Sequence, residues 1–239
     1  MTEATLGTRA LTCAAEPWDF VFDPAHTALL VIDMQNDFCA IGGYCHAYMA
    51  KKGLGDEAIA LLREPIEPLS DVLDACRSAG VLVVYTVEAH HPDLNDVPDN
   101  KMEGTINVGA PIGSEGPLGR LLIRGEQGSE VVEELAPREG ERVLHKPGKG
   151  AFFATELDHI LRNNAITHLL ITGVTTDCCV LGTRMEARDR GYHTVQLEDC
   201  CAATRRENHA AVFNMIRTHP EAFGLMASSG ALVSALGGR

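Results

Sequence analysis

The spacing of apolar residues along this chain changes repeatedly, from short apolar runs typical of strands to the three-to-four-residue period of helices. Short β-branched, apolar runs such as TALLVI at 27–32 have no polar side, which is typical of strands covered on both faces of a sheet. Amphipathic stretches with apolar residues every three or four positions follow most of these runs and predict helices. The predicted strands are 27–33, 81–87, 142–146, 167–172 and 193–198. The predicted helices are 56–79, 154–164, 178–190 and 204–217.

This alternation predicts an α/β fold with a doubly wound, mainly parallel sheet flanked by helices on both faces. No linker-like stretch divides the 239 residues, so we expect a single domain over 1–239. Residues 1–22, with three aromatic side chains near their end, are expected to form an arm that packs on the body or on a neighbour. The Gly-, Pro-, Asn- and Asp-rich segment 88–141 breaks the alternation, which predicts a pocket wall or a subunit contact.

Composition narrows the possible partners. The formal net charge of −13 disfavours nucleic acid and anionic membranes as partners. No apolar run approaches the roughly 20 residues of a membrane helix, and the N-terminus lacks a signal-peptide core, so a cytoplasmic protein is expected. The eight cysteines show no regular spacing, which predicts free thiols. Cys178, Cys200 and Cys201 are expected to be buried, and Cys13 to be exposed.

The stretch after the predicted strand 167–172 contains candidate chemistry. Thr176 and Asp177 are favourable N-cap residues, so Cys178 and Cys179 fall in the first turn of the next helix. Unpaired backbone N–H groups and the helix dipole favour a thiolate there, and the same amides can hold an oxyanion. Because free cysteines are often small core residues, the local pattern alone fits either interpretation.

Two further segments end predicted strands with charged residues. Asp33 follows the run 27–32 at the sheet edge where α/β proteins place their sites, and its carboxylate could accept a thiol proton. A capping or loop-ordering aspartate is the alternative interpretation. Lys146 ends the strand 142–146 and could keep such an acid ionised and stabilise charge developing on a substrate. Lys149 is the alternative for this role, and either lysine could instead be a solvated loop residue.

Taken together, Asp33, KPGKGAFFAT at 146–155 and GVTTDCCV at 173–180 resemble the isochorismatase-like, cysteine-dependent hydrolases. The resemblance implies a catalytic triad of Asp33, Lys146 and Cys179. Cys179 is chosen over Cys178 because the family pattern ends in Cys-Val, which matches Cys179 and the following valine.

The same resemblance carries further implications for the site. It implies a cis peptide bond between Val174 and Thr175, with the backbone amides of Thr175 and Cys179 forming the oxyanion hole. By motif position, it also implies a set of substrate-binding residues, in which Phe152 fits the core equally well: Phe38, Tyr44, Glu88, Phe152 and His219. Members of the superfamily are dimers or tetramers, so a homo-oligomer is expected.

Several loop stretches are similar to biuret hydrolases and their triuret-cleaving relatives. They include GGY at 42–44, EAHHPDL at 88–94, DNK at 99–101 and LEDCCAAT at 197–204. Since loops determine specificity on such scaffolds, the resemblance implies a small-molecule ureide substrate, biuret or triuret, cleaved through a cysteine thioester with release of ammonia. The C-terminal loop at 217–220 reads RTHP where biuret hydrolases have a glutamine, which keeps triuret as a candidate.

The sequence is also compatible with other functions. Glu88, His90 and His91 are similar to the beginning of the nicotinamidase metal site, but the later histidines have no match. Fewer than three ligands argue against a metal, and we expect no cofactor. The alternatives are a ureidoacrylate or N-carbamoylsarcosine type of amidase, a nicotinamidase, and a non-catalytic binding protein on the same fold. Vinyl-ether hydrolysis of isochorismate needs no cysteine nucleophile, so Cys179 argues against it.

Overall fold

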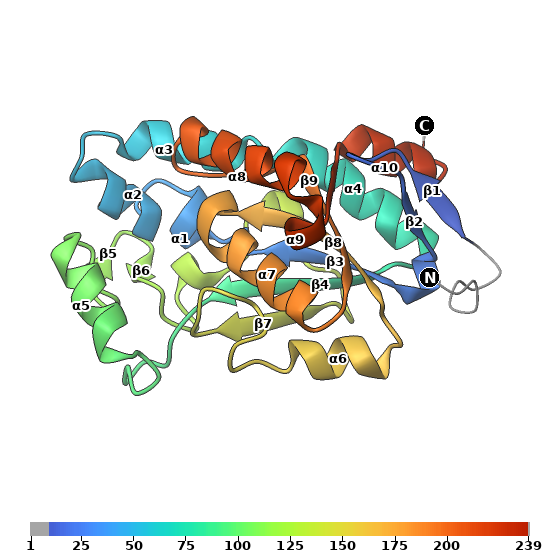
Figure 1. The fold of residues 1–239 in the computed structure, drawn as a ribbon. Helices are drawn as coiled ribbons and strands as arrows, with labels where there is room; N and C mark the ends of the chain where they lie inside the picture. Colours follow the sequence, from blue (N-terminus) through green and yellow to red (C-terminus); the bar gives the residue numbers. More distant parts are fainter. Residues whose placement is uncertain (1–9, 239) are drawn as a thin grey trace.

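The computed structural model describes residues 10–238, which are built around a six-stranded sheet (Figure 1). The strand order is β10-β9-β8-β3-β4-β7, and every neighbouring pair is parallel. The strands are β3 (Thr27–Ile32), β4 (Leu82–Glu88), β7 (Arg142–Lys146), β8 (His168–Val174), β9 (His193–Ala202) and β10 (Leu225–Ala227). This topology confirms the predicted parallel α/β fold.

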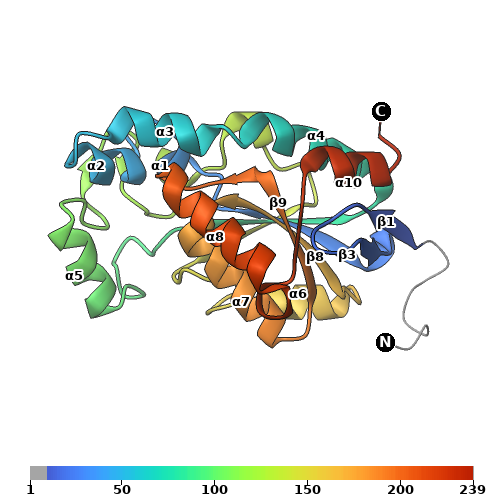
Figure 2. The same ribbon diagram turned by 45° about the horizontal axis from the view of Figure 1, so that its top comes forward.

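Helices cover both faces of the sheet, as Figures 1 and 2 show. One layer contains α3 (Gly55–Arg63), α4 (Ile66–Ala79) and α10 (Ser229–Ala235), and the other contains α6 (Leu157–Asn163), α7 (Leu181–Asp189) and α8 (Arg206–Thr218). Successive residues of β3 serve opposite layers: Leu29 and Val31 join one apolar cluster, and Leu30 and Ile32 join the other. This explains why the run 27–32 has no polar side.

The N-terminal residues form a hairpin beside the sheet. Strands β1 (Leu11–Cys13) and β2 (Phe20–Phe22) pair antiparallel, and β1 packs against α10. Phe20 and Phe22 are buried while Trp18 is exposed. The packing of this hairpin also buries Cys13, so the expectation of an exposed Cys13 was wrong. The part of the expected arm at 1–9 lies outside the described residues.

Several predicted boundaries differ from the structure for local reasons. The expected helix 56–79 is two helices, α3 and α4, because Pro65 at the junction has no N–H to continue the first helix. The expected helix 178–190 begins as a π-helical turn at Thr176–Val180 and continues as α7. The short elements α1 (Asn36–Cys39), α2 (Tyr44–Ala50), α9 (Pro220–Phe223) and β10 were not predicted.

The first part of the segment 88–141 extends beyond the carboxyl ends of the strands, at the left of Figure 1, and its last residues return along α4 to the start of β7. It contains α5 (Asp99–Asn107), β5 (Glu115–Gly116), β6 (Gly119–Arg120) and two 3-10 turns. Buried Asp37 ties this segment to α2, because its carboxylate accepts the N–H groups of Leu122 at 2.9 Å and Tyr44 at 3.1 Å. Asp37 therefore orders loops, and burial raises its pKa to about 6.

Between residues 10 and 238, no helix is both long and apolar enough to span a membrane.

Candidate active site

Four neighbouring strands each place one reactive side chain near their carboxyl ends. Asp33 directly follows β3, Glu88 ends β4, Lys146 ends β7, and Cys179 lies on the turn that follows β8. Because these strands are parallel and adjacent in the order β8-β3-β4-β7, their ends meet at one edge of the sheet. The structure therefore brings together Asp33, Lys146 and Cys179, the three residues that the motifs singled out.

A glycine allows the close approach of β8 and β3 beside the site. Gly173 has a φ of +108°, and a Cβ atom built there would lie 2.0 Å from the carbonyl oxygen of Ile32. No other residue fits this position without moving the backbone. The peptide bond between Val174 and Thr175 is cis, as the resemblance implied. The turn that follows is closed by the amides of Cys178 and Val180, which donate to the carbonyl of Thr175 at 3.0 and 3.2 Å.

Asp33 and Lys146 form a buried ion pair. Lys146 Nζ lies 2.8 Å from Asp33 Oδ2, and the Thr86 hydroxyl donates to Asp33 Oδ1 at 2.8 Å. Both charged side chains are fully buried. Burial lowers the pKa of Lys146, but the negative charge of Asp33 outweighs it and the net pKa is raised, so Lys146 stays protonated. Asp33 itself has a φ of 53°, which turns the chain sharply at the end of β3.

Glu88 is the centre of a larger charge cluster. Its Oε1 accepts from Lys101 Nζ at 2.7 Å and from Lys149 Nζ at 2.9 Å, and its Oε2 lies 3.8 Å from Lys146 Nζ. The Cys179 thiol points at the same carboxylate, with Sγ 3.7 Å from Oε2. Burial alone raises the pKa of Glu88, but the three ammonium groups together hold it well below its usual range. Glu88 is therefore an anion that accepts hydrogen bonds and a poor proton acceptor.

The main chain at Glu88 is fixed by a second residue that the sequence did not single out. The Gln35 carboxamide accepts the Glu88 N–H at 2.7 Å and donates to the Glu88 carbonyl at 3.1 Å. This two-point contact mimics a strand pairing and positions the end of β4. Gln35 lies two residues after Asp33, and nothing in the sequence pattern around it indicates this role.

The surroundings of Cys179 change the expectation of a resting thiolate. The neighbouring Cys178 thiol and burial raise the pKa of Cys179, the Asp33 and Glu88 carboxylates raise it further, and Lys146 only partly opposes them. Cys179 is 4% exposed, whereas Cys178 is half-buried rather than buried as expected. Burial and the two carboxylates thus favour the protonated Cys179 thiol, in opposition to the helix N-terminus, which favours the thiolate.

Among the described residues, one group of three potential metal ligands falls at this site. Asp33, Glu88 and Cys179 each place one ligand atom within 4.8 Å of the others. An ammonium group already lies within 3.0 Å of each carboxylate, where a cation would otherwise bind. His90 is buried nearby but belongs to a different contact, with its Nδ1 3.3 Å from Asp96. The donor set is thus arranged for ion pairs with lysine and does not fit a metal.

The expected substrate-binding residues divide into two groups. Phe38 on α1 and Tyr44 on α2 lie edge to face with ring centroids 6.2 Å apart, at the same end of the sheet as Glu88. Phe152 instead stacks on Tyr192 with centroids 5.9 Å apart and belongs to the core. Phe152 is therefore a buried core residue, in agreement with its other interpretation, and its role as a pocket residue stays a prediction.

The structure also contradicts the expectation for His219. It follows the last turn of α8 with a side chain that is 64% exposed, and α9, which it begins, packs against α7. That contact is made by Arg188 near the last turn of α7, which donates to the carbonyls of Glu221 and Ala222. Cys179 precedes the first turn of the same helix. His219 therefore lies at the far end of α7 from the thiol and does not join the site within one chain.

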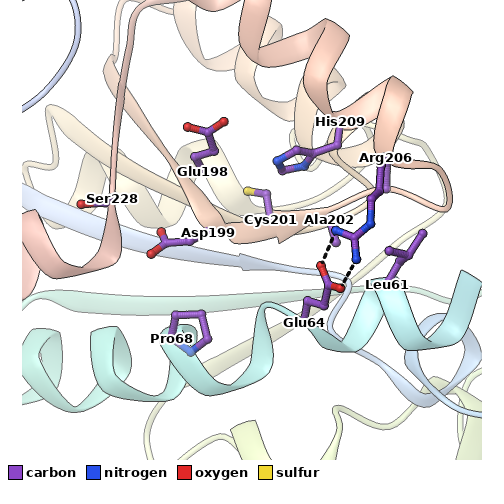
Figure 3. A pocket seen from close by; sticks show the side chains of 11 residues that line it. Leu61, Glu64, Pro68, Glu198, Asp199, Cys201, Ala202, Arg206, His209 and Ser228 are labelled. Carbon is purple, nitrogen blue, oxygen red and sulfur yellow. Dashed lines mark hydrogen bonds and ion pairs between the residues drawn. The ribbon is translucent and has the colours of Figure 1, made fainter.

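A separate cleft of about 490 Å³ opens behind the nucleophile turn (Figure 3). It is bounded by α3 and α4 on one side and by the start of α8 on the other, with Glu64 and Arg206 paired across it. The stretch 197–204, one of the loop stretches that the resemblance drew on, supplies its floor. None of the triad residues lines this cleft. Its link to the site is indirect, through His209 Nδ1, which lies 3.0 Å from the Thr176 hydroxyl.

Comparison with known proteins identifies the family. A model of the isochorismatase domain matches residues 27–229. The chain belongs to the isochorismatase family. Its sequence is 32% identical to the ureidoacrylate amidohydrolase RutB of Klebsiella variicola over 215 residues, which is 86% of each chain.

Solved structures of this family agree with the assignment. An isochorismatase family protein from Desulfovibrio vulgaris is 28% identical with a TM-score of 0.68, covering 89% of this chain and 98% of its own. The N-carbamoylsarcosine amidase of Thermoplasma acidophilum is 27% identical with a TM-score of 0.62, covering 85% and 96% of the two chains. The predicted enzyme class, an amidohydrolase of this superfamily, is confirmed at that level.

Proposed function

We propose that this protein hydrolyses the terminal carbamoyl C–N bond of a small, uncharged linear ureide, biuret or triuret, and releases ammonia. The observation that carries the proposal is the position of the Cys179 sulfur, which lies within 4.8 Å of carboxylate oxygens of both Asp33 and Glu88. One carboxylate is engaged by three ammonium groups and the other by one, so the two acids suit different roles.

In the proposed reaction, Asp33 takes the proton of Cys179 as the thiolate attacks the terminal carbonyl carbon. The oxyanion of the tetrahedral intermediate is held by the backbone amides of Thr175 and Cys179. Asp33 returns the proton to the leaving nitrogen, ammonia departs, and a thioester of the remaining carbamoyl group stays on Cys179. Water then gives a proton to Asp33 and adds to the thioester carbonyl. Collapse of this second intermediate breaks the C–S bond, and the proton returns to the sulfur.

Lys146 has a supporting role in this scheme. Its ammonium group lies 2.8 Å from Asp33 and also donates to the Gly148 carbonyl at 3.0 Å, so two partners fix its position. Fixed in this way, it orients the Asp33 carboxylate and offsets the negative charge that moves between Asp33 and the sulfur. Lys149 is half-exposed and pairs with Glu88, which makes it the weaker candidate for this role.

Glu88 is proposed to bind the substrate through its N–H groups. A ureide presents neighbouring N–H donors, and a carboxylate accepts two of them side by side. Glu88 Oε2 is the oxygen that faces Cys179, so a ureide bonded there places its carbonyl carbon beside the sulfur. Phe38 and Tyr44 are proposed as the apolar side of this pocket.

The balance of charge supports an uncharged substrate. Lys101, Lys146 and Lys149 each lie within 3.0 Å of a carboxylate oxygen, so each ammonium group at the site already has a partner. An anionic substrate would have to displace one of these pairs, whereas a neutral ureide needs only hydrogen bonds.

A second candidate is hydrolysis of an N-carbamoyl acid of the ureidoacrylate type. The observation in its favour is the similarity to the ureidoacrylate amidohydrolase RutB over most of both chains. Such a substrate has a carboxylate, so it would require a lysine of the cluster to exchange partners on binding.

The test is ammonia release from a panel of biuret, triuret, ureidoacrylate, N-carbamoylsarcosine and nicotinamide. We expect the highest kcat/KM with biuret or triuret, and Cys179→Ala should abolish turnover while Cys178→Ala keeps it. A clear preference for ureidoacrylate would replace the first proposal by the second, and more than a few per cent activity in Cys179→Ala would refute both. Sedimentation of the same preparation tests the proposed dimer or tetramer.

A further inference from the structure

Helix α5 is attached to the rest of the molecule in an unusual way. It projects beyond the carboxyl ends of the strands (Figure 1), and Thr105 is its only buried residue. Of its two large apolar side chains, Ile106 is 55% exposed and Met102 is partly buried against the core. Nine residues are too few for a helix that is stable by itself, and Gly104 in the interior costs about 1 kcal/mol more. Apolar packing of α5 against the core is therefore limited to Met102 and contributes little to holding the helix in place.

Lys101, near the start of α5, makes the polar attachment. Its side chain is 13% exposed, and its Nζ donates to Glu88 Oε1 at 2.7 Å and to the Pro147 carbonyl at 2.5 Å. The helix is thus joined to the ends of β4 and β7 by one ammonium group. Both contacts lie directly at the reaction centre, next to the carboxylate that faces the Cys179 thiol.

The reaction centre is closed in this arrangement. Asp33, Glu88 and Lys146 are fully buried, and Cys179 is 4% exposed. A substrate of several heavy atoms reaches the sulfur only if part of the enclosure moves. Lys146 belongs to the sheet and Lys149 to the loop that follows it, whereas Lys101 belongs to a helix outside the sheet.

We propose that α5 is a lid over the active site and that the Lys101–Glu88 ion pair is its latch. Opening costs little, because Glu88 keeps Lys149 at 2.9 Å when Lys101 leaves and no buried carboxylate is left unpaired. Closing over a bound substrate excludes water and fixes the Glu88 carboxylate. Lys101 is then a positioning residue, and the inference rests on Cys179 being the reacting thiol.

The lid can be tested without any ureide, through the rate at which iodoacetamide alkylates Cys179. Labelling is followed by peptide mapping in Lys101→Met, Lys101→Arg and the matched control Lys51→Met, which removes an exposed lysine from the same side of the molecule. We expect Lys101→Met to be labelled about tenfold to a hundredfold faster, as for loss of one charge-assisted hydrogen bond. Lys101→Arg and Lys51→Met should behave like the unmodified protein.

Electrostatics alone predicts the opposite change in the labelling rate, a decrease. Removing a positive charge near Cys179 makes its thiolate scarcer and slows alkylation, so faster labelling identifies an opened lid. Labelling of folded Lys101→Met at or below the unmodified rate overturns the latch, whatever the substrate panel gives. With an active ureide, Lys101→Met should also raise KM more than it lowers kcat, and Lys101→Arg should restore most of this change.

A second measurement uses the unmodified chain and covers the case in which Lys101→Met does not fold. Amide hydrogen exchange should be faster in α5 than in α4 by about a hundredfold or more, because α5 opens as a unit while the remainder stays folded. Equal protection of α5 and α4 would also overturn the lid.

Discussion

Replacing Glu88 by glutamine should make the protein less stable and its nucleophile more acidic at the same time. The substitution removes one negative charge and nearly preserves the shape of the side chain. It leaves Lys101 and Lys149, which lie 2.7 and 2.9 Å from the carboxylate, without their charged partner. It also removes the anion that lies 3.7 Å from the Cys179 sulfur.

The size of both effects follows from the geometry. Two unit charges about 4 Å apart interact by about 4 kcal/mol at an effective dielectric constant of about 20. At about 1.4 kcal/mol per pKa unit, the pKa of Cys179 should fall by up to about 3 units in Glu88→Gln. Breaking a buried ion pair by removing one partner costs about 3–5 kcal/mol of unfolding free energy. For a chain of this length, that lowers Tm by about 6–20 °C.

The two effects have separate assays. Calorimetry or thermal circular dichroism gives Tm, and the midpoint of the pH dependence of Cys179 alkylation gives the pKa of the thiol. The midpoint is used because its value does not depend on the plateau rate, which loss of the Lys101 latch also raises. Glu103→Gln, an exposed substitution on α5, is the matched control and should change neither quantity beyond about 0.5 kcal/mol. A midpoint in Glu88→Gln that stays constant or rises would refute the electrostatic description of this site.

Two other predictions concern stability away from the site. Burial, with a contribution from His193, lowers the pKa of His168 to about 4, so its neutral form stabilises the fold fully above about pH 6.5 and this contribution is lost as the pH falls towards 4. After allowance for solvent screening, the free energy of unfolding should fall by on the order of 1–2 kcal/mol through His168. Measured by urea unfolding, the free energy of unfolding of His168→Gln should therefore decrease less on acidification than that of the unmodified protein. Fully buried Arg184 donates to the Leu225 carbonyl at 2.7 Å and to Gln196 at 2.8 Å, so Arg184→Ala leaves two buried acceptors without a donor. At about 1–3 kcal/mol for each acceptor, the substitution should cost about 2–6 kcal/mol of unfolding free energy and expose the C-terminal segment to limited proteolysis. Unchanged proteolysis in that variant would mean that other contacts hold β10.

The periodicity of the sequence was sufficient for five of the six strands of the sheet and for most of the helices that cover it. Strand 142–146 was predicted with its observed boundaries, because Val143 and Leu144 form a short apolar run and Lys146 follows shortly after it. Pro65 marks the boundary between α3 and α4 in the sequence. A single helix was nevertheless predicted there, because the amphipathic pattern continues across this proline. Short elements such as α1 have no period of their own, and they form because Asp37 and its neighbours bond to a segment about 85 residues away.

The triad positions came from motifs, whereas the remainder of the charge cluster depends on tertiary structure. Lys101 reaches Glu88 only because the segment 88–141 folds back over the ends of β4 and β7. A lysine in a polar, irregular stretch looks like a solvated residue, and no local pattern distinguishes it from Lys51. For His219 the motif position was misleading. It predicted a pocket residue, whereas His219 follows the last turn of α8 and its side chain is exposed.

The same distinction between local and tertiary features applies to the ionisation of Cys179. The local features of Cys179, a helix N-terminus with unpaired amides, favour ionisation by an amount that falls off within one turn. The carboxylates at the ends of β3 and β4 act at comparable distance with full charges, although each of them is paired with lysine. A protonated resting thiol beside Asp33 makes proton transfer part of the reaction itself. A substrate that excludes water and aligns its carbonyl with the sulfur then determines when the nucleophile forms, which limits alkylation or oxidation of Cys179 in its absence.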